Sequence, residues 1–461
     1  MARLDKTFTS KDIFALAFGT MVGWSWIMLS GIWANNAGML GAVIAFAAGA
    51  VMCIFVGLAY AELTPALPYT GGSVVYSFKA MGYWPSVIAG LAACFSYIGI
   101  IALEGPAFAT AIDYIIKIPR IGYLWTVCGF DVYISWALIG TAGAVVLTWV
   151  NIRGASMTAV FQKTANFGKI GVGVLFVFGG LMHGNTEYVT PLFTDGKGFI
   201  ATLVMVPAMF VGFDVIPQSA GEMNISPKKI PRLLIISILA SAAWYILMIF
   251  ATCISAPLDV RLTGEIPVAD AMAYAFGGIF WGKVCIIGAL CGIITAWNGF
   301  IFACARCLYA MSNARMLPAF LGKLHPKYNT PYIAVLISGV ISAASCFMGK
   351  EAISWFVNAS SFGVIILYIM DVLALIFLRR KYPEIKRPYM IKRFTPVALA
   401  AIIAVVAFGA LYMPFGPSAL SAIEWSFAVV WFAAGFILAL WCRFRYKDVT
   451  MEERENALIN M

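Results

Sequence analysis

Long apolar runs separated by short polar connections extend along almost the whole chain. A helix needs about 20 mostly apolar residues to cross a bilayer, and twelve runs come close to or exceed that length. They lie near residues 13–37, 40–64, 85–112, 132–151, 164–184, 198–222, 231–256, 280–312, 331–348, 353–378, 394–414 and 424–445. The pattern predicts an all-α integral membrane protein with 12 transmembrane helices. We expect one transmembrane domain over residues 1–445 and a cytoplasmic tail over residues 446–461.

Two of these runs are interrupted by residues that disfavour a helix. The first run is broken at residues 19–26 and the sixth at residues 210–217. In lipid, irregular backbone persists only where it borders protein or a cavity. Interrupted spans at corresponding places in two halves are the best sequence indication of a transporter's binding site. The spacing predicts discontinuous helices 1 and 6 in a 5+5 inverted repeat, with repeats over about 13–184 and 198–378 and two further helices over about 394–445.

Composition agrees with a membrane protein and sets its orientation. Of 461 residues, 62% are hydrophobic and 11% are charged, against about 25% charged in soluble domains. If both termini are cytoplasmic, Lys169 lies within the membrane. Only six of the 31 basic residues then lie on the other side, namely Lys117, Arg120, Lys197, Arg261, Lys283 and Lys350. The positive-inside rule therefore predicts a multi-pass protein of the cell membrane with cytoplasmic termini. The net charge of +10 reflects this bias and affinity for anionic lipid, and no nucleic acid partner is expected.

Residues suited to catalysis or metal binding are scarce. The ten cysteines lie almost wholly in apolar runs, where buried thiols are inert. Cys304 and Cys307 have a CxxC spacing without a second pair, and only two histidines are present. We expect no enzyme activity, metal or cofactor.

The first break offers backbone groups to a ligand. Gly19 and Gly23 let the chain leave helical geometry and let a ligand approach closely. Unwinding exposes N–H groups that suit a carboxylate and carbonyls that suit an ammonium, as in an amino acid zwitterion. The alternative is a glycine-rich face for helix packing.

Five ionisable residues inside the runs need an explanation, because charge within a membrane is costly. Asp214 lies in the second break and Glu104 in the third run, and each could meet substrate or serve only structure. Glu62 and Glu222 lie near cytoplasmic ends, so snorkelling or capping is expected. Lys169 lies inside the fifth run. There it could exchange a proton near neutral pH, supply a fixed charge where another transporter binds sodium, or snorkel toward the cytoplasm.

Four short motifs, in order, resemble those of the amino acid–polyamine–organocation superfamily of transporters. The resemblance covers nearly the whole chain, and span six is similar to the cationic amino acid transporter branch. The motifs are GTMVGWSWI at residues 19–27, YAEL with PYTGGS at 60–73, FVGFD with GE at 210–222, and RCLYAM with LP at 306–318.

The resemblance implies a substrate held between spans one, three, six, eight and ten. Lys169 matches a fifth-span lysine linked to proton coupling. The substrate-binding residues implied are Met21, Val22, Gly23, Trp24, Ser25, Trp26, Glu104, Ala208, Val211, Gly212, Phe213, Asp214 and Phe300. Trp24 and Ser25 replace the family's Ser and Gly. Trp24 could narrow the pocket, stack on an amine or point away into packing.

These features predict a permease that moves an amino acid or related amine by alternating access, proton-coupled or exchanging and sodium-independent. The alternatives are a sodium-coupled amino acid symporter, a polyamine- or ethanolamine-type amine permease, and a transporter-like nutrient sensor. The expected partners are the small-molecule substrate and membrane lipid, and a small accessory subunit stays open.

Overall fold

The computed structural model describes residues 4–350, 352–417 and 419–460. The outermost residues of the predicted domain and tail, 1–3 and 461, lie outside this description. The α-helices are α1 (Ser10–Met21), α2 (Ser25–Ala66), α3 (Ser73–Met81), α4 (Tyr83–Ile115), α5 (Ile134–Ile152), α6 (Ala155–His183), α7 (Gly196–Met209), α8 (Val215–Gln218), α9 (Ile230–Ser255), α10 (Leu258–Thr263), α11 (Pro267–Ala275), α12 (Ile279–Asn313), α13 (Tyr332–Ser345), α14 (Ala352–Lys381), α15 (Phe394–Leu411), α16 (Ala422–Arg445) and α17 (Met451–Ile459).

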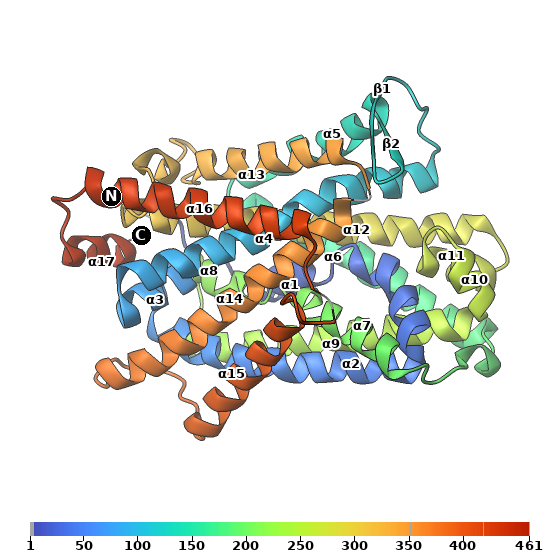
Figure 1. Ribbon diagram of the computed structural model, residues 1–461, viewed down its shortest axis with the longest axis horizontal. Coiled ribbons are helices and arrows are strands. Elements are labelled where there is room, and N and C mark those ends of the chain that lie inside the picture. Colours follow the sequence, from blue (N-terminus) through green and yellow to red (C-terminus); the bar gives the residue numbers. More distant parts are fainter. Residues whose placement is uncertain (1–3, 351, 418, 461) are drawn as a thin grey trace.

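A small hairpin and several 3-10 turns complete the described fold. Strands β1 (Tyr123–Val127) and β2 (Phe130–Tyr133) pair antiparallel. The 3-10 turns are η1 (Thr186–Val189), η2 (Ala220–Glu222), η3 (Pro227–Lys229), η4 (Ala319–Gly322) and η5 (Cys346–Met348). In Figure 1 the two chain termini lie at one end of the molecule, called the terminal end below. The β1–β2 hairpin, α10 and α11 lie at the other end, called the opposite end.

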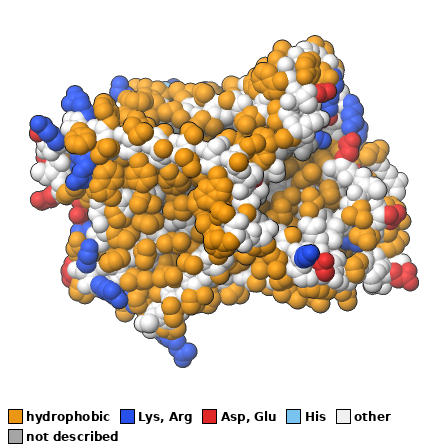
Figure 2. All heavy atoms as spheres, in the orientation of Figure 1, with side chains coloured by type: hydrophobic (Ala, Val, Ile, Leu, Met, Phe, Trp, Pro, Cys, Tyr) orange, Lys and Arg blue, Asp and Glu red, His pale blue; other side chains and the backbone are white. Residues whose placement is uncertain are grey.

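The prediction of a mostly helical membrane protein is confirmed. Nine helices within the described residues are long and apolar enough to cross a membrane, and two shorter apolar helices accompany them. All twelve predicted runs overlap helices of the structure. In Figure 2 apolar side chains cover the middle of the visible face, while charged side chains gather toward its ends. Large apolar residues such as Phe167 and Phe178 of α6 are exposed, as expected for a surface that faces lipid.

Helix α2 contains the second predicted run and the later part of the first. Its 42 residues would extend about 63 Å at 1.5 Å per residue, roughly twice the thickness of a bilayer's apolar core. Gly38 interrupts it with φ 75° and ψ 163°. A Cβ at this position would lie 2.5 Å from the carbonyl oxygen of Leu192, so glycine is needed where the chain bends against this neighbouring segment.

Both predicted interruptions are present as gaps between helices. Residues 22–24 separate α1 from α2, and residues 210–214 separate α7 from α8. Gly212 has φ +125°, and a Cβ there would lie 2.8 Å from the backbone nitrogen of Met21. The second break therefore touches the last turn of α1, directly before the first break, and the contact requires a residue without a side chain.

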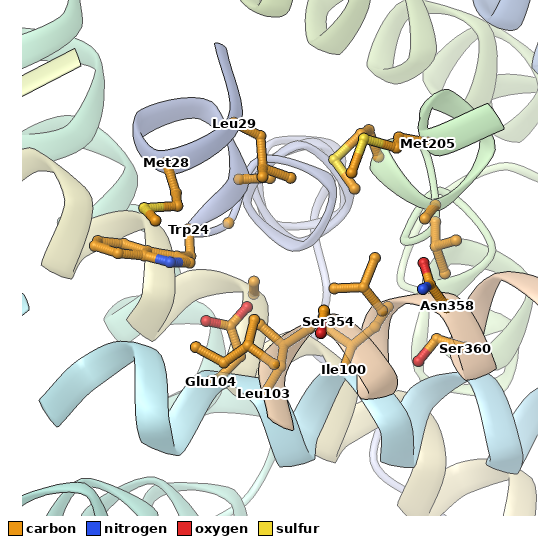
Figure 3. A pocket seen from close by; sticks show the side chains of 18 of the residues that line it. Trp24, Met28, Leu29, Ile100, Leu103, Glu104, Met205, Ser354, Asn358 and Ser360 are labelled. Atoms are coloured by element: carbon orange, nitrogen blue, oxygen red, sulfur yellow. The ribbon is translucent and has the colours of Figure 1, made fainter. Parts of the chain in front are cut away.

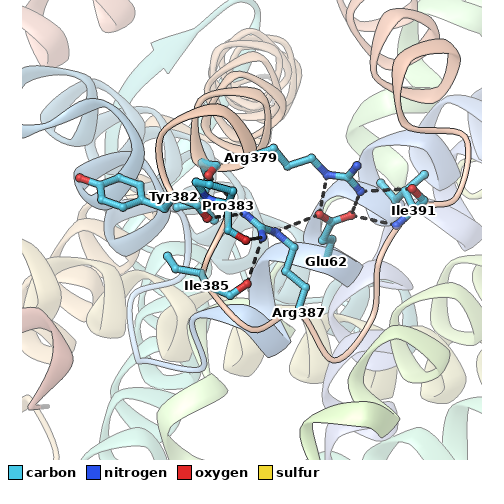
Figure 4. Close-up of polar contacts among 8 residues, drawn as sticks. Glu62, Arg379, Tyr382, Pro383, Ile385, Arg387 and Ile391 are labelled. Atoms are coloured by element: carbon cyan, nitrogen blue, oxygen red, sulfur yellow. Dashed lines mark hydrogen bonds and ion pairs between the residues drawn. The ribbon is translucent and has the colours of Figure 1, made fainter.

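At the terminal end, Glu62 of α2 binds Arg379 in the last turn of α14 and Arg387 in the connection after that helix (Figure 4). Arg379 forms a two-point ion pair with Glu62, and Arg387 Nε lies 3.4 Å from Glu62 Oε1. The backbone N–H of Ile391 also donates to Glu62, at 2.9 Å. The snorkelling or capping expected of Glu62 is therefore wrong, because its carboxylate is buried and joins α2 to the α14–α15 connection.

A second buried pair closes the same end. Arg306 of α12 donates to Glu222 of η2 through Nε at 2.8 Å and Nη2 at 3.0 Å. The snorkelling or capping expected of Glu222 is also wrong, because both side chains are almost fully buried. The Arg306 guanidinium lies 3.7 Å from the ring centroid of Phe302, which adds a cation–π contact.

The predicted tail contains α17, which packs on the terminal end. Arg454 Nη1 donates to the carbonyls of Ala314 and Arg315, each at 2.8 Å. Glu455 forms an ion pair with Lys79 of α3. Burial of the Lys79 ammonium opposes its charge, but the hydrogen bond with Glu455 outweighs this and raises the pKa of Lys79. The tail thus joins the ends of α3 and α12.

Candidate functional site

A cavity of about 440 Å³ lies beside the break between α1 and α2, within the range usual for small-molecule sites. Helices α4, α7, α12 and α14 complete its walls. Most of the lining is apolar, with a few polar side chains at separate points. Figure 3 shows Trp24 and Glu104 toward one end of the cavity and Asn358 and Ser360 toward the other. An elongated ligand could therefore meet polar groups at two places.

The first break forms one wall. Gly23 and Trp24 line the cavity. A Cβ on Gly23 would lie 2.8 Å from the Cβ of Ala296 in α12, so glycine permits this close approach. Trp24 lines the cavity and is also buried in the hydrophobic core, so narrowing of the pocket, stacking on an amine and packing all stay predictions for it.

Ser25 begins α2, and its hydroxyl is hydrogen-bonded to Tyr245. The hydroxyl of Tyr245 donates to the carbonyl of Met21 at 2.8 Å and lies 2.8 Å from Ser25 Oγ. A phenol has one proton, so when Tyr245 donates to Met21, Ser25 donates to Tyr245. Ser25 then offers a ligand only acceptor capacity.

Glu104 brings a carboxylate to the cavity from α4. Its side chain is buried, lines the cavity and points toward it in Figure 3. Oε2 has no hydrogen-bond partner among the described residues. Oε1 would lie 3.0 Å from a Cβ built on Gly23, so the carboxylate adjoins the break. Buried carboxylates are normally paired, and an ammonium in the cavity would supply the missing partner.

Lys169 of α6 binds the backbone of the same break from outside the cavity lining. Its side chain is fully buried, and Nζ donates to the carbonyl of Val22 at 2.8 Å and to Thr295 Oγ1 at 3.2 Å. The ammonium also lies 5.0 Å from the ring centroid of Phe18. The side chain therefore turns inward instead of snorkelling, and its positive charge meets a carbonyl that helix unwinding has freed.

Asp214 belongs to the second break but faces away from the cavity lining. One oxygen accepts the N–H of Gly212 at 2.8 Å and the other accepts the hydroxyl of Tyr97. Gln218 Nε2 extends this network to Tyr97 at 3.4 Å. In this state, Asp214 fixes the turn around Gly212 and ties it to α4.

The predicted substrate-binding residues separate into two groups. Those that line the cavity are Met21, Gly23, Trp24, Ser25, Glu104, Ala208, Val211 and Phe300. Those that lie outside the lining are Val22, Trp26, Gly212, Phe213 and Asp214. Trp26 packs on Trp244 with ring centroids 5.5 Å apart. Contact with substrate stays a prediction for both groups.

Several lining residues were not predicted. Lys350, Asn358 and Ser360 come from α14 or the residues before it, and Met28 and Met205 add flexible apolar surface. Asn358 donates to Glu424 of α16 at 2.7 Å. The polar residues inside the apolar run 353–378 were the available signal, and nothing in a single sequence indicates which methionines face a cavity.

The cavity has different surroundings at its two ends. Lys350 lines it, is exposed, and lies 5.4 Å from the ring centroid of Phe130 in β2, so the cavity extends toward the opposite end. On the terminal side, Phe213 packs on Tyr60 and Tyr368 with centroids 5.7 and 5.6 Å apart. Along α14, Tyr368 of this aromatic layer lies between Ser360, which lines the cavity, and Arg379 at the terminal end.

The described residues contain no group of three or more His, Cys, Asp and Glu side chains that could hold a metal ion.

Comparison with known proteins shows similarity over almost the full length. A family model described as amino acid permease matches residues 8–439. The methylthioribose transporter of Bacillus subtilis is 23% identical, covering 94% of this chain and 93% of that protein. The branched-chain amino acid permease BcaP of Bacillus subtilis is 23% identical over 82% of each chain. Cationic amino acid transporter 8 of Arabidopsis thaliana, vacuolar, is 26% identical, covering 95% of this chain and 74% of that protein.

Proposed function

Because the chain belongs to the amino acid permease family of the amino acid–polyamine–organocation superfamily, we propose that it is a secondary transporter working by alternating access. Its substrate is an amino acid or a related amine, bound in the central cavity. The observation that carries this proposal is the contact between two interrupted helices beside that cavity. Freed backbone N–H and carbonyl groups at such breaks suit a zwitterion.

The finer architecture is twelve spans arranged as a 5+5 inverted repeat, over about 13–184 and 198–378, with two extra helices over about 394–445. It is supported by breaks in the first and sixth predicted runs. The orientation has both termini in the cytoplasm of the cell. It is supported by the excess of basic residues at the terminal end. With the cavity extended toward the opposite end, the described conformation corresponds to an outward-facing state.

Coupling uses protons or exchange and is independent of sodium. Lys169 Nζ donates to the Val22 carbonyl and to Thr295 Oγ1, which are the kinds of oxygen ligand a sodium ion would need. An ammonium at this position repels a cation and can exchange its own proton. Loss of that proton would release the carbonyl and loosen the break.

The substrate carries an amine and tolerates apolar atoms. The unpartnered Oε2 of Glu104 supports an ammonium, while the neighbouring walls are mainly apolar. The relatives are named for transport of branched-chain amino acids, cationic amino acids and methylthioribose, so the test includes all three classes.

The test begins with a thermal-shift screen of purified protein against amino acids, biogenic amines and methylthioribose. A ligand that binds only folded protein raises the apparent Tm. The best ligand is then radiolabelled, and its uptake into proteoliposomes is measured with and without sodium and with the outside made acidic. We expect a Tm increase from an amine-bearing ligand. Its uptake should be independent of sodium and should depend on external pH or on substrate preloaded in the proteoliposomes. Sodium-dependent uptake would contradict the coupling, and uptake of methylthioribose alone would contradict the substrate class.

A further inference from the structure

A further buried carboxylate, Asp371 of α14, lies outside the cavity lining. Its Oδ2 accepts the hydroxyl of Tyr60 from α2 and that of Ser73 from α3, the latter at 2.9 Å. Oδ1 is buried without a partner among the described residues, as is the hydroxyl of Tyr368 one turn earlier. A buried polar group left unpaired is costly, so this cluster is not optimised for packing alone.

Asp371 lacks a cationic partner. No described Lys, Arg or His forms an ion pair with it, whereas Glu62 and Glu222 are each held by arginine. Arg379 lies eight residues further along the same helix, but it binds Glu62 and not Asp371. An arginine would fix a carboxylate in its ionised form. Hydroxyl groups both donate and accept, so Tyr60 and Ser73 can serve Asp371 with or without a proton.

The other ionisable groups around Asp371 are acidic or neutral. Asp214 of the second break interacts with it electrostatically across Tyr60 and Tyr368, and Tyr76 faces it from α3. Helix α15 has no ionisable side chain, and Lys197 of α7 lies at that helix's far end. Tyr97, on α4, is bound to Asp214.

Two carboxylates in one membrane-embedded region are unfavourable when both are ionised. Asp214 has a backbone N–H and a phenol to stabilise its charge. Asp371 also has two hydroxyl donors but leaves one oxygen bare among the described residues, so ionisation is less well compensated at Asp371 than at Asp214.

Asp371 lies between the cavity and the terminal end. Ser360 of α14 lines the cavity. Asp371 is eleven residues further along, about 16 Å at 1.5 Å per residue. It lies beyond the aromatic layer of Phe213 and Tyr60 but before the Glu62–Arg379 pair. Opening of the terminal end would expose it to water.

We propose that Asp371 is a proton-binding site on the terminal side of the cavity. It holds one proton on its carboxyl group in the described state. It releases that proton to water as the terminal end opens, which leaves the carboxylate facing Tyr60 and Ser73. The role of Asp371 in transport rests on the proposed proton-coupled function. Whether its carboxyl group holds a proton can be measured without any transport assay.

The first measurement is infrared spectroscopy of the purified full chain. A protonated carboxyl group gives a C=O stretching band distinct from that of a carboxylate. We expect such a band at neutral pH in the wild type, its loss at higher pH, and its absence in Asp371→Asn. Glu424→Gln is the control, because Glu424 is also buried and bound by hydroxyl and amide donors but lies outside the cluster. An unchanged band in Asp371→Asn would overturn the proposal.

The second measurement is transport in proteoliposomes. Asp371→Asn should retain substrate exchange without a pH gradient but lose accumulation driven by acid outside, so that the accumulation ratio falls to about 1. Wild-type accumulation in this variant would overturn the coupling role. If accumulation by the wild type does not depend on pH, the proton coupling in the proposed function is contradicted. The infrared result still decides whether Asp371 holds a proton.

Should Asp371→Asn fail to fold, Ser73→Ala takes its place. This variant keeps the carboxyl group and removes one donor to its ionised form. We expect the midpoint of the infrared titration to move to higher pH by about one unit or more. An unchanged midpoint would overturn the proposal.

Discussion

Replacing Lys169 by Met tests the link between α6 and the first break directly. Methionine keeps an unbranched side chain of similar length but removes the charge and every donor. In the wild type, Nζ donates to the carbonyl of Val22 at 2.8 Å and to Thr295 Oγ1 at 3.2 Å. The substitution therefore removes the hydrogen bonds from α6 to the first break and to Thr295 of α12 without opening a large void.

The expected effect follows from these two contacts. Hydrogen bonds from charged groups contribute about 1.5–3 kcal/mol each, so the bridge is worth about 3–6 kcal/mol before any relaxation. Because about 1.4 kcal/mol corresponds to a tenfold change, the population of the bridged arrangement should fall at least about 100-fold. If transport passes through that arrangement, the uptake rate of Lys169→Met falls by a similar factor and no longer depends on pH.

The assay is radiolabelled uptake into proteoliposomes over a range of external pH, corrected for the amount of folded protein inserted. Lys163→Met is the matched control on the same helix. Its side chain is 48% exposed and pairs at 2.7 Å with the largely buried Asp12 near the terminal end. Asp12 keeps its hydrogen bonds from Thr9 without Lys163, and an ion pair with one solvent-exposed partner contributes only about 0–1 kcal/mol. The control should behave as wild type. Wild-type uptake and an unchanged pH profile in Lys169→Met would refute the role given to this bridge.

Three further variants probe the cavity and its closure. Glu104→Gln should weaken binding of cationic substrates about 5- to 30-fold while changing neutral substrates less than about twofold; equal losses in a binding titration would make Glu104 structural. Gly23→Val should abolish substrate-induced Tm increases, because even a Cβ would lie 2.8 Å from that of Ala296; a normal ligand shift would show that the break has room to spare. Arg306→Ala should destabilise the protein by about 3–5 kcal/mol by leaving Glu222 buried and unpaired, and restored unfolding stability in Arg306→Ala with Glu222→Ala would confirm the pairing energy.

The breaks could be predicted from sequence because their cause is local. Gly23 and Gly212 lie in the two gaps, where glycine lets the chain leave helical geometry whatever its tertiary surroundings. Gly19 and Pro217, which also indicated the breaks, lie inside α1 and α8 instead. Charge inside an apolar run is likewise a local signal, and it indicated Lys169, Glu104 and Asp214. Asp371 satisfies that criterion equally, since it lies inside the run 353–378, and it was missed.

The partners of these charges could not be predicted, because they depend on the folded arrangement. Glu62 and Arg379 are 317 positions apart, and nothing local distinguishes a lipid-facing arginine from one that a distant carboxylate binds. Lys169 binds a backbone carbonyl, a group that every residue carries. Asp214 resembled a ligand for substrate, but its hydrogen bonds to Gly212 and Tyr97 turn it away from the cavity lining.

The distribution of strong and weak contacts indicates where the terminal end can open. Arg306 fixes α12 to η2 and Arg379 fixes the end of α14 to α2, both through buried carboxylates. Breaking a buried ion pair costs about 3–5 kcal/mol. The aromatic layer formed by Phe213, Tyr60 and Tyr368 is held by ring contacts worth about 0.5–1.5 kcal/mol each beyond burial. Movement should therefore part the aromatic layer while each ion pair moves as a rigid unit, and that route first exposes Asp371 and the Tyr60 and Ser73 hydroxyls bound to it.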